Sequence, residues 1–409
     1  MDYQFSEALA GMHGTATREI YRVLSRPGII SLAGGSPAHD CLPYRQIEEI
    51  AAELFADHDL MTKGYRYGTT EGFPELRELV LGLAASFGIN ISGMDTGNAI
   101  ITSGGGQSID LILKTFVNRG DTVLAENPTY QGFLQTAQSY GAVIAGVDAG
   151  EDGLIIQDLE EKILRHKPKL LYVVPTFSNP TGKTYSAANR KAIVELALRY
   201  GVMVAEDDPY SRLRISGEAV PPLKVFDTNN TCVVYISSFS KVVSPGIRLG
   251  FSIGPAEVIR KMTIAKQGVD LSSSNISQLL IQKYLERGYY YPNIEKSLPI
   301  YRERKGSMFE ALGKYFPEEF SHTDPDGGIF IWGEFRTPID TAAMFSEALK
   351  RNVVYIEGRS FFADGRGRSS LRLNFSNETP ENIDKAVRIL GELSKMTIAA
   401  CEERETPAP

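Results

Sequence analysis

The stretch PKLLYVVP (residues 168–175) is a short apolar run bounded by two prolines. Its central residues, LLYVV, show no alternation of apolar and polar positions, which predicts a strand that is covered on both faces. An amphipathic helix pattern follows over 186–200, and a second apolar run, VMVAED (202–207), comes directly after it. The order strand, helix, strand predicts two parallel strands joined by a crossover helix.

The same alternation extends along the chain in both directions. Further strands are expected over 98–102, 121–127, 142–147, 231–236 and 249–253, and further helices over 107–117, 129–140 and 156–166. Strands that alternate with helices in this way are typical of a parallel sheet with helices on both faces. We therefore expect an α/β fold built on a seven-stranded, mostly parallel sheet.

The two ends of the chain follow other patterns. The part up to about residue 95 is expected to be mainly helical. Near the C-terminus we expect helices over 277–290, 294–316 and 380–397, and strands over 327–335, 353–358 and 370–376. We expect a large domain over 45–280 and a smaller α+β domain over 281–409, which the N-terminal segment 1–44 joins.

Composition narrows the possible functions. The chain has 409 residues and a formal net charge of −7, which argues against a nucleic-acid or anionic-membrane partner. Because the three cysteines are far apart and the five histidines show no close pairing, we expect neither a disulfide framework nor a metal site. The absence of a secretory signal and of an apolar run of roughly 20 residues predicts a cytoplasmic protein.

Ligands of open α/β sheets bind beyond the carboxyl ends of the strands, so the loops there carry the candidate site residues. The first loop, TSGGGQS (102–108), places three glycines at a predicted helix start, where free N–H groups can bind phosphate. The loop is not a dinucleotide-binding fingerprint, because Ile109 stands where the third glycine is required. A tight turn between strand and helix explains the glycines equally well.

Two further loops carry polar residues at strand ends. In TFSNPTGKT (176–184), the ending GKT resembles a P-loop, but Phe177 stands where the first glycine is required. The Asn-Pro turn there either directs the Asn179 amide into the cleft or is an ordinary turn. In EDDPY (206–210), an acid that closes the buried strand could bind a metal ion or pair with a buried cation, and a solvated acidic turn is the alternative, mainly for Glu206 and Asp208. For Asp207, a lysine in a later loop favours the pairing with a cation.

The stretch SSFSKVVSPGIRLGF (237–251) follows another buried strand and contains a single lysine, Lys241, with no charged neighbour within six residues on either side. Such surroundings favour the neutral amine, which is a nucleophile toward carbonyls. Arg248 follows a Pro-Gly turn that lets the chain double back. A phosphate-binding turn, a reactive lysine, an acid at a strand end and an arginine are together the parts that hold pyridoxal 5′-phosphate.

Seven motifs, in this order along the chain, resemble those of the class I/II aminotransferases, which are fold-type I pyridoxal phosphate enzymes. The resemblance covers roughly residues 15–397 and is closest to the branch of 2-aminoadipate, kynurenine and aromatic aminotransferases. It implies the fold-type I transferase fold. The motifs are ISLAGGSP (30–37), YRYGTTEGFPELRE (65–78), ENPTYQGF (126–133), SNPTG (178–182), EDDPY (206–210), SSFSKVVSPGIRLGF (237–251) and LRLNFS (371–376).

The resemblance implies a site for pyridoxal phosphate. Lys241 would form the imine with the cofactor and move the proton between the substrate Cα and the cofactor C4′. Asp207 would pair with the pyridine nitrogen. The other cofactor-binding residues implied are Asn179 and Tyr210 for the phenolate oxygen, Tyr130 for the ring face, and Gly105, Gly106, Ser238 and Arg248 for the phosphate.

The resemblance also implies residues for the substrate and for a partner. Arg372 would bind the substrate α-carboxylate in a bidentate fork, and Gly35 and Asn179 would meet the substrate beside it. Arg18 matches an arginine that binds a side-chain carboxylate in some relatives, although a solvated helix arginine explains it equally well. Tyr67 would reach the phosphate in the neighbouring subunit, so the active unit would be a homodimer.

The sequence departs from this branch in one loop, where relatives often carry side chains and this chain has Gly104, Gly105 and Gly106 before Gln107. Two side-chain contacts to the phosphate would be lost, and backbone N–H groups would remain.

The activity that follows is transfer of an amino group from an L-amino acid of aminoadipate, aromatic or branched type to a 2-oxo acid, with 2-oxoglutarate expected first. A pyridoxal-phosphate-dependent β-lyase would use the same residues, so this activity remains an alternative. A P-loop-like ATPase is a more distant alternative. A transcription regulator with this fold would carry a further N-terminal domain, for which motifs that begin near residue 30 leave no room.

Overall fold

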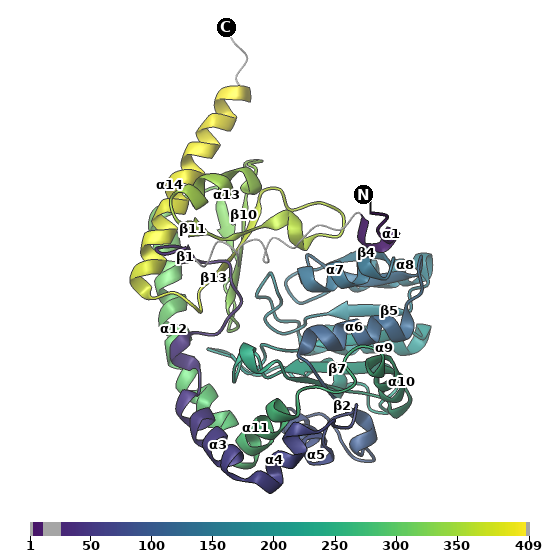
Figure 1. Cartoon of the computed structure of the whole chain (residues 1–409). Helices are drawn as coiled ribbons and strands as arrows, with labels where there is room; N and C mark the ends of the chain where they lie inside the picture. Colours follow the sequence, from purple (N-terminus) through teal and green to yellow (C-terminus); the bar gives the residue numbers. More distant parts are fainter. Residues whose placement is uncertain (1–2, 11–25, 406–409) are drawn as a thin grey trace.

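A computed structural model of the chain, which describes residues 3–10 and 26–405, contains a seven-stranded sheet (Figure 1). Its order is β2-β8-β7-β6-β5-β3-β4, and β8 alone runs against the other strands. The predicted α/β fold with a mostly parallel sheet is therefore confirmed. The strands are β2 (Ala99–Thr102), β3 (Thr122–Asn127), β4 (Val143–Asp148), β5 (Leu170–Val173), β6 (Met203–Asp207), β7 (Val233–Ser238) and β8 (Gly250–Ile253).

Helices cover both faces of this sheet. Successive side chains of each strand point to opposite faces, so an entirely apolar strand needs cover on both. Val234 and Ile236 share a core with α6 (Gly105–Phe116), α7 (Gln131–Ser139) and α10 (Ala256–Gln267). Tyr235 lies between them and packs on the opposite face. The helices of that face are α3 (Tyr44–Ala56), α4 (His58–Tyr65), α5 (Pro74–Ala85) and α11 (Asn275–Glu286) at one end, and α8 (Ile156–His166) and α9 (Ala187–Tyr200) at the other.

A second, smaller sheet is antiparallel and has the order β12-β13-β10-β9. Figure 1 shows it on the side where α14 extends away from the large sheet. Beside it, β1 (Ile30–Ser31), from the N-terminal part, pairs with β11 (Val353–Val354). The predicted smaller α+β unit is therefore confirmed. Its elements are β9 (Phe320–His322), β10 (Phe330–Phe335), β12 (Ile356–Glu357), β13 (Ser370–Asn374), α12 (Tyr290–Tyr315), α13 (Thr341–Lys350) and α14 (Pro380–Glu405).

Most element bounds agree with the sequence patterns to within a few residues. Helix α6 begins at Gly105, two residues before the predicted start at 107, because its first turn is built from glycines. Helices α10 and α13 and strand β9 were not predicted, and α1 (Glu7–Ala10) is a single turn. Within residues 3–10 and 26–405, no helix is both long enough and apolar enough to cross a membrane.

Candidate active site

A cavity of about 290 Å³ lies where the loops after the parallel strands meet the smaller sheet. Eleven of the thirteen residues assigned to the site from the sequence line it. These are Gly35, Gly105, Gly106, Tyr130, Asn179, Asp207, Tyr210, Ser238, Lys241, Arg248 and Arg372. They come from both ends of the chain and from the middle, so the fold itself creates the site.

The two other predicted residues lie elsewhere. Tyr67 is 90% exposed in this single chain and does not line the cavity. Arg18 lies outside the described residues, so its predicted contact with a side-chain carboxylate stays a prediction.

Lys241 presents its amine to the cavity from the turn that follows β7. Its Nζ donates a hydrogen bond to the Gly35 carbonyl oxygen at 2.6 Å. Burial lowers the pKa of Lys241 to about 8, and the positive charges of Arg372 and Arg248 add to this effect while Asp207 opposes it. About half of the lysines are therefore neutral at a pH near 8, and the causes are burial and two nearby arginines rather than a lack of charged neighbours.

Asp207 closes β6 with a carboxylate that is buried beside the cavity. Its Oδ2 accepts a hydrogen bond from the Tyr172 hydroxyl at 2.7 Å, and its Oδ1 lies on the side of Gly105. Burial raises the pKa of Asp207 to about 6, whereas the bond from Tyr172 acts in the other direction by favouring the charged form. The carboxylate is thus mainly ionised at neutral pH, with one oxygen directed toward the cavity.

The neighbouring acids of Asp207 serve other partners. Glu206 accepts hydrogen bonds from the backbone N–H groups of Leu223 and Lys224, and Asp208 accepts one from the Tyr235 hydroxyl. All three acids are buried, so the alternative of a solvated acidic turn was wrong. Only Asp207 of the three lines the cavity.

The glycine turn before α6 leaves room that side chains would fill. Gly104 has a φ of +90°, and a Cβ there would lie 3.0 Å from Arg248 Nη2. A Cβ on Gly250 would also meet the backbone of Gly104 and Gly105 at 3.0 Å. The first-turn N–H groups of Gly105 and Gly106 have no partner within the helix, so they can bind an anion at the helix N-terminus. Glycine is therefore favoured by the positive φ at position 104 and by close packing at position 250, and a turn without side chains suits an approaching phosphate.

Arg372, on β13, is held rigidly at the other side of the cavity. Its Nη1 donates to Asn179 Oδ1 at 2.6 Å, and its Nη2 donates to the Ala33 carbonyl oxygen. Its guanidinium carbon lies 4.0 Å from the centroid of the Phe330 ring and 5.1 Å from that of Phe361. A guanidinium fixed in this way is suited to binding a carboxylate in one orientation.

Three of the residues that sequence reasoning missed at this site contact predicted ones. Ser240 lines the cavity, and its backbone N–H donates to Ser238 Oγ at 3.1 Å. Phe330 lies against Arg372, and Tyr172 orients Asp207. The signals were a hydroxyl next to Lys241, and a single tyrosine within the otherwise aliphatic strand LLYVV.

The set of side chains fits pyridoxal phosphate. Hydroxyls, free N–H groups and Arg248 gather near the glycine turn and suit a phosphate, while the Lys241 amine suits an aldehyde. The Asp207 carboxylate suits a protonated ring nitrogen, and Asn179 and Tyr210 offer polar groups for a ring oxygen. The cavity is also lined by Tyr130, whose ring can cover one face of a flat ligand.

Comparison with known proteins leads to the same chemistry. The family model for aminotransferase class I and II matches residues 27–390. Aromatic-amino-acid aminotransferase 1 of Thermococcus litoralis is 37% identical over 97% of this chain and 95% of its own length.

Two solved structures extend this similarity to three dimensions. Kynurenine aminotransferase from Pyrococcus horikoshii is 36% identical, with a TM-score of 0.90 over 96% of this chain and 97% of its own. The α-aminoadipate aminotransferase from Thermus thermophilus, complexed with N-(5′-phosphopyridoxyl)-L-leucine, is 34% identical. Its TM-score is 0.88, over 97% of this chain and 98% of its own.

These matches support neither a β-lyase nor a P-loop-like ATPase, and they agree with the branch expected from the motifs. The chain belongs to the class I and II aminotransferases of fold-type I and is a pyridoxal-phosphate-dependent aminotransferase.

Proposed function

We propose that this enzyme transfers the amino group of an L-amino acid with an aromatic, 2-aminoadipate-type or branched side chain to a 2-oxo acid, with 2-oxoglutarate as the first acceptor to test. The observation that carries this proposal is the fixed Arg372 guanidinium in the same cavity as the Lys241 amine. The names of the relatives, which include aromatic, kynurenine and α-aminoadipate aminotransferases, support these donor classes.

Eight residues of the cavity have defined tasks in this proposal. Pyridoxal phosphate, when bound, supplies an electron sink beside the substrate Cα. Arg372 binds the α-carboxylate and so orients the Cα–H bond, and the neutral Lys241 Nζ removes that proton and later returns it. The Gly35 carbonyl oxygen holds the protonated amine, and the Asp207 carboxylate balances positive charge at the ring nitrogen. Gly105, Gly106, Ser238 and Arg248 hold the phosphate.

The donor class is tested by steady-state kinetics with 2-oxoglutarate and a panel of aromatic, branched and dicarboxylic L-amino acids. We expect kcat/KM for at least one of these classes to exceed that for L-alanine at least about tenfold, because side-chain burial distinguishes donors by roughly 1–3 kcal/mol. Release of pyruvate and ammonia from L-cysteine or L-serine, without transamination of any donor, would contradict the proposal.

We also propose that the enzyme acts as a homodimer in the cytoplasm. Tyr67 is 90% exposed, yet Asn275 Nδ2 fixes the backbone in front of it by donating to the carbonyl oxygens of Lys63 and Arg66 at 2.9 and 2.7 Å. An exposed aromatic side chain on a firmly held backbone suits contact with a second copy. The buried free thiols of Cys41 and Cys232 suit a reducing compartment.

Replacing Tyr67 with phenylalanine is expected to weaken pyridoxal phosphate binding about tenfold, because one hydrogen bond to a charged group is lost. The measurement is the cofactor dissociation constant of the Tyr67→Phe homodimer and of hybrids formed with Lys241→Ala subunits. In the hybrid, the only site with a lysine receives Tyr67 from the other subunit, so binding there is expected to return to the wild-type value. A hybrid that stays weak would show that Tyr67 does not act across the interface.

A further inference from the structure

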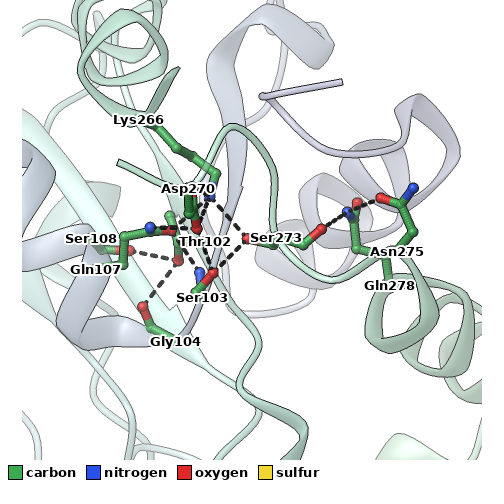
Figure 2. Close-up of polar contacts among 10 residues, drawn as sticks. All are labelled: Thr102, Ser103, Gly104, Gln107, Ser108, Lys266, Asp270, Ser273, Asn275 and Gln278. Carbon is green, nitrogen blue, oxygen red and sulfur yellow. Dashed lines mark hydrogen bonds and ion pairs between the residues drawn. The ribbon is translucent and has the colours of Figure 1, made fainter. Parts of the chain in front are cut away.

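A polar cluster lies against the glycine turn (Figure 2). It contains Ser103 and Gln107, which flank the three glycines, together with Lys266 and Asp270 from the end of α10 and the loop that follows. Lys266 is buried in it, Ser103 and Gln107 are half-buried, and Asp270 is partly exposed. None of these four residues lines the cavity. The cluster therefore touches the phosphate-binding turn without offering a side chain to the ligand.

Asp270 ties the two ends of the turn together. One of its oxygens, Oδ2, accepts hydrogen bonds from Ser103 Oγ at 2.9 Å and from Gln107 Nε2 at 2.8 Å. Gln107 Oε1 in turn accepts from the Ser103 backbone N–H at 2.8 Å, which closes a ring of bonds around the turn. The amide of Gln107 is thus used for holding the loop.

Lys266 completes the cluster from the protein interior. Its side chain is fully buried, and its Nζ donates to Asp270 Oδ1 at 2.7 Å, Gln107 Oε1 at 2.8 Å and Ser273 Oγ at 3.2 Å. An ammonium group has three hydrogens, so these partners use all of them. The Lys266 charge is therefore balanced within the cluster by Asp270.

The turn depends on outside support because its own residues are glycines. Gly104 adopts a left-handed conformation, and three consecutive residues without side chains have more conformational freedom than any other sequence of this length. Arg248 Nη2 donates to the Ser103 carbonyl oxygen at 3.3 Å, so the arginine also rests on this turn. The N–H groups of such a turn keep one position only when bonds from surrounding residues hold the backbone.

We propose that the Lys266–Asp270 pair is a positioning unit for the cofactor phosphate, acting through Ser103 and Gln107 on the turn Gly104–Gly106 and on Arg248. This inference rests on the proposed phosphate role of that turn. The three glycines have no side chains with which to fix the turn. Residues outside the cavity fix it instead.

The test compares two ligands that differ only in the phosphate. Apo-protein of the Asp270→Asn variant is titrated with pyridoxal phosphate and with pyridoxal, and binding is followed by cofactor absorbance. We expect the dissociation constant for pyridoxal phosphate to rise about tenfold, because a charged hydrogen-bond acceptor is lost, while that for pyridoxal stays within about twofold of wild type.

A matched control separates positioning from general loss of stability. Lys224 and Asp227 form a second lysine–aspartate pair, with Nζ and Oδ2 2.8 Å apart, and Asp227 bonds the backbone at the start of β7 rather than the glycine turn. Both side chains of this pair are fully buried, whereas the Asp270 side chain is 27% exposed. Asp227→Asn is expected to lower thermal stability and to leave the ratio of the two dissociation constants unchanged. If Asp270→Asn does not fold, Ser103→Ala removes only one hydroxyl of the cluster and is expected to change the ratio in the same direction.

The outcomes are distinct. A raised pyridoxal phosphate constant with an unchanged pyridoxal constant supports the positioning role. Equal weakening of both ligands, or no change in either, overturns it while leaving the proposed function in place. If wild-type protein binds both ligands equally well, the phosphate role of the turn and this inference both fail.

Discussion

Replacing Lys241 with alanine is expected to lower kcat for transamination by at least about 10⁴-fold. The substitution removes the amine that is proposed both to capture the cofactor and to move the substrate Cα proton, and general bases alone contribute about 10² to 10⁴. The Arg372 guanidinium and the Asp207 carboxylate stay in place, so substrate and cofactor binding are expected to persist in part. The measurement is single-turnover transamination by the variant loaded with pyridoxal phosphate.

Lys183 provides a control for this prediction. It is the lysine of the GKT sequence, and its Nζ donates to Glu151 Oε1 at 2.7 Å, outside the cavity. Lys183→Ala is expected to keep kcat within about twofold of wild type, as is usual for surface substitutions. Comparable losses in both variants would contradict the assignment of Lys241.

The lowered pKa of Lys241 also predicts a pH dependence. Only the neutral amine can attack the cofactor aldehyde, and its fraction falls tenfold for each pH unit below the pKa of about 8. The rate at which apo-protein takes up pyridoxal phosphate is therefore expected to rise with pH and to level off above about pH 8. A rate that does not change between about pH 6 and pH 9 would contradict this.

Replacing Asp207 with asparagine is expected to lower kcat about 10²- to 10³-fold, the loss typical when one preorganised electrostatic contact is removed. Asparagine has nearly the same shape, but it carries no charge to balance a protonated ring nitrogen. Because burial raises the pKa of Asp207 to about 6 in the chain without cofactor, the carboxylate loses its charge below that pH, and the affinity of apo-protein for pyridoxal phosphate is expected to fall there. An Asp207→Asn variant with wild-type kcat would contradict the role of this residue.

Substitutions at two buried tyrosines distinguish an effect on the charge of Asp207 from a general effect on packing. Tyr172 donates to Asp207 at 2.7 Å, and Tyr235, two strands away, donates to Asp208 at 2.8 Å. Tyr172→Phe removes a donor that favours the charged carboxylate, so the acid limb of the pH profile of pyridoxal phosphate binding to apo-protein is expected to move to higher pH. Tyr235→Phe removes an equally buried hydroxyl and is expected to leave that limb in place. Equal shifts in both variants would show that the limb does not report Asp207.

The large sheet and most of its site could be predicted from the sequence for a physical reason. Buried parallel strands are short apolar runs, and the loops after them converge on one edge, so Lys241, Asp207 and Asn179 meet there. The register of the strands was not needed for this conclusion. Local patterns were therefore sufficient for the position of the cavity.

Long-range pairings and contacts behind the cavity could not be predicted in this way. Strand β1 has two residues, and its pairing with β11 joins positions 30 and 353, which no local period reports. The contact of Tyr172 with Asp207, and that of Asp270 with Ser103, depend on how neighbouring elements pack. Helix α10 was missed because lysines, a threonine and an arginine interrupt its apolar pattern.

The most direct test of the central claim is a half-reaction with purified enzyme. A single L-amino acid of a donor class is added without any 2-oxo acid, and the absorption spectrum, pyridoxamine phosphate, the new 2-oxo acid and ammonia are measured. We expect the visible cofactor band to disappear, with one equivalent each of pyridoxamine phosphate and 2-oxo acid per active site and no ammonia. A band that persists through many turnovers while ammonia accumulates would contradict the account.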